Sequence, residues 1–131
     1  MKKLLTATCY LFSFFFLHAQ QGVKWERSIG GNNLDFYFAN VITRGGTVIK
    51  IGSTLSNNGD CIGNHGGYDV ILTALNANGT ALWNKIIGGA DNEGGGSVDT
   101  LVDGNIIAGF TYGSTDGDII GNHSASSDIA I

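Results

Sequence analysis

The sequence predicts an all-β fold made of four-stranded antiparallel units that recur about every 58 residues. Trp25 in "VKWERSIGG" and Trp83 in "ALWNKIIGG" lie 58 residues apart, and each precedes a Gly-Gly pair by the same step. The loop "NGDCIGNH" at 58–65 returns as "DGDIIGNH" at 116–123. The 21 glycines and the absence of proline suit a chain with many turns. Four-stranded sheets repeated at this spacing are typical of β-propeller blades.

A predicted export signal precedes the repeats. Met1 to Lys3 form a short positive start, residues 4–17 are mostly apolar, and Ala19 offers a small residue for cleavage. This pattern predicts a signal peptide at 1–19 and a repeat region at 20–131. The apolar run is shorter than the about 20 residues that a transmembrane helix needs, so no membrane span is expected in the mature chain. We expect the protein at the cell surface or outside the cell.

The strands of the first unit follow from short apolar runs of period two, bounded by Gly, Asn and Asp. The turn sequence "NANG" at 76–79 should join the third and fourth strands, because Asn and Gly tolerate positive φ. Residues 23–29 are expected to form the last strand of a preceding or ring-closing blade. The strands expected within the full blade, at 36–87, are 36–43, 47–54, 68–75 and 80–87.

The second unit, a truncated blade at 95–131, stops within its third strand, "SDIAI". Its run "IIAGFTY" matches "VIKIGST" of the first unit only with a one-residue shift, which sets Gly52 opposite Gly109. Repeat proteins need about three units to bury their faces. The sequence therefore predicts an incomplete propeller, the N-terminal part of a longer protein. The alternative is that other copies or a partner supply the missing blades.

Charge and cysteine content narrow the possible partners. Without Lys2 and Lys3 the mature part has five basic and eleven acidic side chains, a net charge of −6. A polyanion would be repelled, so we expect no nucleic acid partner. Cys61 is the only cysteine after cleavage, so no internal disulfide is expected. Ile119 stands at its place in the second unit, which predicts a small apolar packing position.

The repeated loops favour a structural role. Catalytic residues normally differ from their repeat counterparts, whereas His65 and His123 are equivalent. We expect Asn64 and Asn122 to form Asx turns, with Gly63 and Gly121 supplying the backbone freedom. Each histidine would then close its loop through a side-chain hydrogen bond.

Calcium binding is the alternative role of these loops. Two pairs of oxygen-bearing side chains stand two residues apart, which are Asn58 and Asp60, and Asp116 and Asp118. Hard cations prefer such ligands. A helix-loop-helix calcium loop would need a third oxygen ligand, where this loop has isoleucine, and a later glutamate that it lacks. Zinc would need three or four nitrogen or sulfur ligands together, and each loop offers one.

Aromatic residues offer further candidates. Trp25 and Trp83 recur at one strand position. This recurrence favours core packing between blades as their role, and a sugar-stacking platform is the alternative. Tyr68 and Tyr112 are not equivalent and are better candidates for a non-repeated binding surface. No nucleophile, base and orienting acid can be assembled, so we do not expect an enzyme.

The chain resembles a family of exported tandem-repeat proteins. Residues 23–131 contain, in order, "WERSIGG", "VIKIGST", "NGDCIGNH" and "DVILTALNANGTALW", and "GDxIGNH" occurs twice. This order resembles β-propeller-like surface or secreted proteins of Bacteroidetes-type bacteria, which often use the type IX secretion pathway. The resemblance implies a propeller and export but no particular activity. No C-terminal sorting domain is visible.

These observations predict a non-catalytic binding or scaffold module at the cell surface or outside the cell. Its ligand would be a protein or a glycan recognised by variable loops on a rigid frame. No cofactor is expected, calcium apart. The alternatives are a propeller stiffened by calcium and an accessory domain of a longer secreted enzyme.

Overall fold

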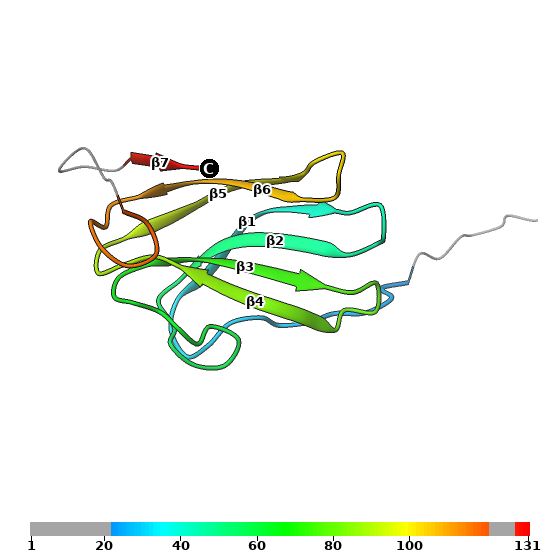
Figure 1. The fold of residues 1–131 in the computed structure, drawn as a ribbon. Coiled ribbons are helices and arrows are strands. Elements are labelled where there is room, and N and C mark those ends of the chain that lie inside the picture. Colours follow the sequence, from blue (N-terminus) through cyan, green and yellow to red (C-terminus); the bar gives the residue numbers. More distant parts are fainter. Residues whose placement is uncertain (1–21, 121–127) are drawn as a thin grey trace, which may run out of the picture.

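The computed structural model describes residues 22–120 and 128–131, and these residues form an all-β structure with seven strands and no helix. The strands build two antiparallel sheets, one of four strands and one of three (Figure 1). The all-β, antiparallel class predicted from the sequence is confirmed. The predicted signal peptide at 1–19 and Gly121, Asn122 and His123 of the second loop lie outside the described residues. Within the described ranges no helix is long and apolar enough to cross a membrane.

The first sheet corresponds to the predicted full blade. Its strands lie in sequence order, so each neighbouring pair is an antiparallel hairpin. Apolar and β-branched residues dominate β2 and β3, and these two strands are the most buried. The four strands are β1 (Asp35–Ile42), β2 (Val48–Thr54), β3 (Asp69–Leu75) and β4 (Ala81–Ile87).

The second sheet has the order β5 (Glu93–Thr100), β6 (Ile106–Tyr112) and β7 (Asp128–Ala130). Its register matches the first sheet residue by residue. Asp35 pairs with Thr54 in the first sheet and Glu93 with Tyr112 in the second, so both partners move by 58 positions. The one-residue shift predicted between these strands is therefore wrong. Each of the strands β1 and β5 carries a bulge, between Tyr37 and Ala39 and between Gly94 and Ser97.

Three hairpin turns share one design. In each turn, the residue that begins the turn is followed three positions later by a glycine at positive φ. These glycines are Gly46 at +81°, Gly79 at +79° and Gly104 at +90°. Their N–H groups donate to a carbonyl three residues earlier, at 2.9, 2.9 and 3.0 Å. The turn predicted from "NANG" is thus present between β3 and β4, and Asn76 Oδ1 accepts bonds from two backbone N–H groups within it.

The two sheets pack face to face. Strand β5 lies against β1, β2 and β3, and Figure 1 shows the smaller sheet stacked over the larger one. The interface core joins Ile51, Val70 and Leu72 of the first sheet to Phe110 and Tyr112 of the second. Burying each such side chain contributes about 1.5–3 kcal/mol, so this contact is the main apolar link between the sheets.

A second apolar cluster lies on the opposite face of the first sheet. Ile71 and Ile86 pack there with Cys61, whose side chain is fully buried. Cys61 therefore has the packing role expected for it. Ile119, its counterpart, packs against the core between the sheets. Strand β3 is buried on both faces because its alternating side chains reach both clusters.

Residues 23–29 form no strand in the structure, in contrast to the prediction. Their backbone lacks a ladder partner, and side chains hold the segment instead. The indole of Trp25 donates to Ala77 O at 3.1 Å, and Arg27 forms an exposed ion pair with Asp60 at 3.2 Å. Such an exposed pair contributes little, at most about 1 kcal/mol.

Candidate functional site

The repeated acidic loops hold the Gly-Gly segments through side-chain oxygens. In the first unit Gly30 N donates to Asp60 Oδ2 at 3.4 Å, and Asp60 N donates back to Gly30 O at 3.1 Å. In the second unit Gly88 N donates to Asp118 Oδ2 at 3.3 Å, and Asp118 N returns a bond to Gly88 O at 3.0 Å. We call this reciprocal contact the glycine clasp.

Further bonds extend each clasp at matching positions. Asn58 Oδ1 accepts from Asn32 N at 2.9 Å, and Asp116 Oδ1 accepts from Ala90 N at 2.8 Å. The next backbone N–H donates to a serine hydroxyl at 2.9 Å in both units, Ser56 in the first and Ser114 in the second. These bonds satisfy backbone donors that would otherwise lack partners in a glycine-rich turn.

The clasps and the bonds that extend them involve the four residues proposed as calcium ligands. Asn58, Asp60, Asp116 and Asp118 each accept at least one backbone N–H, and all four therefore have a structural partner. Among the described residues, no three His, Cys, Asp or Glu side chains are grouped so that they could hold a metal ion. The sequence reasoning found these residues but did not foresee that glycine N–H groups would be their partners.

A carboxylate at the start of a strand lies next to each clasp and binds the second glycine of the pair, which sequence reasoning missed. Asp35 accepts from Gly31 N at 2.8 Å and from the hydroxyls of Thr54 and Ser56 at 2.5 and 3.1 Å. Burial acts to raise the pKa of Asp35, but these hydrogen bonds outweigh it and leave that pKa below its ordinary value. The sequence signal that could have found this carboxylate is that Asp35 and Glu93 are both acidic and lie 58 residues apart.

Glu93 holds the same place in the second unit and is 1% exposed. Its Oε2 accepts from Gly89 N at 2.9 Å, and its Oε1 accepts from the N–H groups of Gly113 and Ser114 at 3.3 and 3.0 Å. The longer side chain thus reaches backbone donors directly, whereas Asp35 relies partly on hydroxyls. A buried carboxylate is tolerated here because three N–H groups face it.

His65 joins the repeated loop to the start of β3. Its Nδ1 lies 2.7 Å from Asp69 Oδ2, and its backbone N–H donates to the same oxygen at 2.9 Å. Its Nε2 lies 3.9 Å from Asp118 Oδ2, so the ring stands between carboxylates of the two units. Next to it, Asn64 Oδ1 accepts from Gly66 N at 3.1 Å in an Asx turn, and Gly63 has φ of +110°.

Asp69 is fully buried, and its Oδ1 has no hydrogen-bond partner among the described residues. A Cβ built on Gly88 would lie 2.6 Å from both Asp69 Oδ1 and Glu93 Oε2, so the two carboxyls flank this glycine. Burial raises the pKa of Asp69, and the nearby charge of Glu93 raises it further. The bonds from His65 oppose this without cancelling it.

An aromatic cleft of about 400 Å³ lies where the two sheets meet. Phe36 and Phe38 project from one face of β1 and are 46% and 57% exposed. The Phe36 and Tyr68 rings pack with centroids 6.0 Å apart, and a Cβ on Gly95 would overlap the Phe38 ring. The polar residues of the lining are Ser53, Asn92, Glu93 and Thr111.

The cleft is specific to this junction between units. The positions equivalent to Phe36 and Phe38 are Gly94 and Gly96, so the second unit has no matching rings. Sequence reasoning singled out Tyr68 alone in this group. Tyr112, the other tyrosine proposed for a binding surface, is 6% exposed and belongs to the core between the sheets. Comparing each strand position with its repeat counterpart would have found both phenylalanines.

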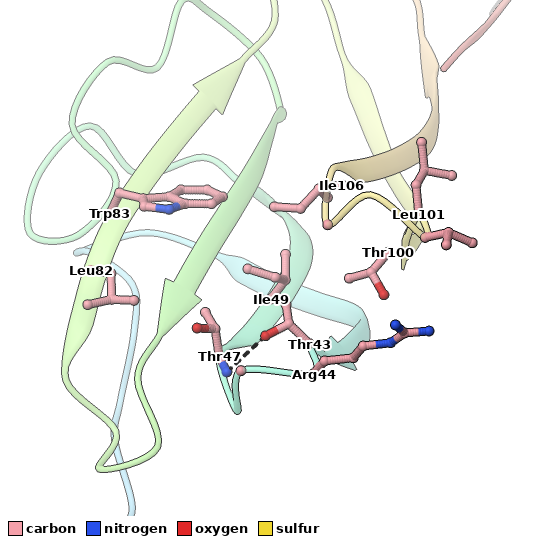
Figure 2. A pocket seen from close by; sticks show the side chains of 12 residues that line it. Thr43, Arg44, Thr47, Ile49, Leu82, Trp83, Thr100, Leu101 and Ile106 are labelled. Carbon is pink, nitrogen blue, oxygen red and sulfur yellow. Dashed lines mark hydrogen bonds between the residues drawn. The ribbon is translucent and has the colours of Figure 1, made fainter.

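Neither tryptophan is in the core formed by the described residues, and their packing between blades stays a prediction. Trp25 is half-buried against the β3–β4 turn, and Trp83 is 41% exposed. Figure 2 shows the Trp83 indole directed across an open groove toward Ile106, with Ile49 between the strands below it. This groove, of about 530 Å³, runs between the β1–β2 turn, β4 and the β5–β6 turn.

Comparisons of the chain with protein-family models, with curated proteins and with solved structures give no match. The geometry of the chain's own residues therefore carries the functional argument.

Proposed function

We propose that this chain is a non-catalytic binding module of an exported repeat protein with propeller-like blades, and that the aromatic cleft binds a glycan. The observation that carries the proposal is the pair of exposed rings, Phe36 and Phe38, above a cleft with polar groups at its edge. Ligand sites combine apolar walls with a few polar groups that fix orientation.

The position of the two rings suits stacking. Phe36 and Phe38, the second of which lies in the β1 bulge, both line the cleft and form one aromatic surface. The Phe38 ring rests on the glycine backbone of β5, which leaves its other side open. Asn92 and Thr111 add hydrogen-bonding groups at the rim, the combination that a sugar ring with hydroxyl edges and apolar faces requires.

The propeller-like part of the proposal is supported by the recurrence of contacts. Both units have the same strand register, the same glycine clasp and a carboxylate at the same strand start. Sheets that stack face to face through a constant offset are the geometry expected of neighbouring blades. Export is supported by the charged start, apolar run and small residue of residues 1–19.

The test is glycan binding by the full mature chain and by a Phe36→Ala, Phe38→Ala variant. Screening on a glycan array followed by calorimetry should find a ligand whose affinity falls at least about tenfold in the variant, which corresponds to 1.4 kcal/mol. Ile42→Ala is the matched control, because Ile42 is 64% exposed on the same strand but outside the cleft. If the chain bound a protein segment and no glycan, its role as a binding module would hold, but the proposed ligand class would be wrong. Equal affinity of the unmodified chain and the Phe36→Ala, Phe38→Ala variant would show that the cleft is not the binding site.

A further inference from the structure

We propose that the groove beside Trp83 is the docking site for the β-hairpin turn that completes the second unit, a turn of the Asn76–Thr80 kind. This inference rests on the repeat-unit part of the proposed function and is independent of the glycan. The chain makes the corresponding contact 58 residues earlier, where Trp25 lies on the β3–β4 turn.

The first contact is the seat of Trp25 on the β3–β4 turn. Its indole Nε1 donates to Ala77 O at 3.1 Å. A Cβ built on Gly79 would lie 2.6 Å from the indole Cδ2 and Cε3 atoms, so the ring lies directly on the glycine. Gly79 is buried by this contact, and a side chain at this position would push the ring away.

The second contact is between turns of the same unit. A Cβ built on Gly46, in the β1–β2 turn, would lie 3.9 Å from Ala77 Cβ. The β3–β4 turn of the first unit is therefore held between two neighbours, Trp25 and the β1–β2 turn.

Both neighbours have counterparts in the second unit, and both counterparts are uncovered. Trp83, equivalent to Trp25, is 41% exposed. Gly104, equivalent to Gly46, has no atom of another described residue, its two chain neighbours apart, within 4 Å of the place where its Cβ would stand. Trp83 and Gly104 line the same groove, and Figure 2 shows the Trp83 indole in it. The two surfaces that enclose a hairpin turn in the first unit thus face one unfilled space in the second.

The register of β7 directs a hairpin into that space. Asp128 pairs with Tyr112 as Asp69 pairs with Thr54, so β7 begins where β3 begins. A strand that continued this register and turned as β3 does would bring its turn beside Gly104. The required chemistry is a glycine at positive φ to lie under the indole and a free carbonyl oxygen to accept its N–H.

The experiment uses the full mature chain extended after Ile131 by a second copy of residues 73–87, with Trp83→Phe made in the added copy. Ile131 occupies the place of Leu72, so the extension continues the register without changing the native sequence. A Trp25→Phe background leaves Trp83 as the only tryptophan. We expect its emission to shift to shorter wavelength and its acrylamide quenching to fall to the value of Trp25 in the unextended Trp83→Phe chain.

The matched control makes Gly79→Asn in the added copy only. Asparagine tolerates positive φ, so the turn is kept, but its Cβ would collide with the indole. Quenching of Trp83 should return to the unextended value. A cyclised hairpin peptide of residues 70–87 with Trp83→Phe, titrated onto the unextended chain, repeats the test if the extended chain does not fold.

The inference is overturned if Trp83 stays as accessible to acrylamide with the extension and with the peptide as without them. It is equally overturned if the Gly79→Asn copy protects Trp83 as well as the glycine copy does. Glycan binding at Phe36 and Phe38 can be measured on the same chains, and its failure would leave the Trp83 result unaffected.

Discussion

Gly88 and Asp118, 30 residues apart, exchange two hydrogen bonds, from Gly88 N to Asp118 Oδ2 at 3.3 Å and from Asp118 N to Gly88 O at 3.0 Å. Gly30 and Asp60 exchange the same two bonds at the same separation. Each pair of bonds joins the Gly-Gly segment that precedes a sheet to the acidic loop of the same repeat unit. The clasp therefore explains why the chain carries the same small loop twice, since each copy binds the Gly-Gly segment that leads into its own sheet.

The glycine within each clasp loop should be irreplaceable. Gly117 has φ of +80°, and a Cβ there would overlap Gly88 O. We expect Gly117→Ala to lower the free energy of unfolding by about 3 kcal/mol, through left-handed strain and loss of the clasp. Gly104→Ala is the control, because φ is +90° but the space is open, and it should cost only about 1 kcal/mol. Equal costs in urea denaturation would show that the clasp adds nothing.

Acid should weaken the first clasp through Asp35. Its folded pKa lies below the unfolded value, so the unfolded chain binds the proton more readily. The resulting stability is present above pH 3.8 and is lost as pH falls through the folded pKa. In the Asp35→Asn variant the decline of unfolding free energy below pH 3.8 should be shallower. Thermal melts from pH 5 to pH 2 provide the measurement, and identical slopes in the two proteins would contradict it.

Asp69 should show the opposite sign. Its folded pKa is raised, so the folded chain holds the proton more tightly than the unfolded chain. Its contribution is present below pH 3.8 and is lost as pH rises through the folded pKa. The stability of wild type relative to Asp69→Asn should therefore decrease as pH increases above 3.8. A difference that grows with pH over this window would mean that the His65 contact outweighs burial.

Calcium should have no measurable effect on stability. The side chains of Asn58, Asp60, Asp116 and Asp118 already accept backbone N–H groups, and no three His, Cys, Asp or Glu side chains of the described residues are grouped to hold a metal ion. Melting temperatures in EDTA and in millimolar calcium should agree. A rise with calcium that disappears in Asp60→Asn, Asp118→Asn would favour the calcium-stabilised alternative.

The strands and turns were largely predictable because their signals are local. Period-two apolar runs placed β2, β3 and β4 to within one residue or so, and "NANG" placed the β3–β4 turn. The strand expected at 23–29 did not form, because a strand depends on a ladder partner that local sequence does not supply. The one-residue shift between β2 and β6 was wrong because similar letters, Gly52 and Gly109, were matched where the hydrogen-bond register keeps a constant offset.

The site was less predictable from the sequence for two reasons. The loop side chains bind backbone atoms, and the cleft is recognised only because its phenylalanines have glycines as repeat counterparts. The loop residues Asn58 and Asp60 were identified, but glycine N–H groups leave no trace in a side-chain pattern. Phe36 and Phe38 looked like ordinary strand residues until their glycine counterparts were placed beside them. Trp83 was expected in the core because Trp25 and Trp83 repeat, whereas Trp25 is covered by the β3–β4 turn and Trp83 is 41% exposed.

The most direct test of the glycine clasp is amide hydrogen exchange measured by NMR on the mature chain. The N–H groups of Gly88 and Ala90 donate to Asp118 and Asp116, so both should be protected in wild type. In Asp116→Ala, Asp118→Ala they should exchange rapidly, while the β2–β3 amides stay protected. Fast exchange of Gly88 and Ala90 in the wild-type chain, with β2 and β3 protected, would contradict the clasp as the link between units.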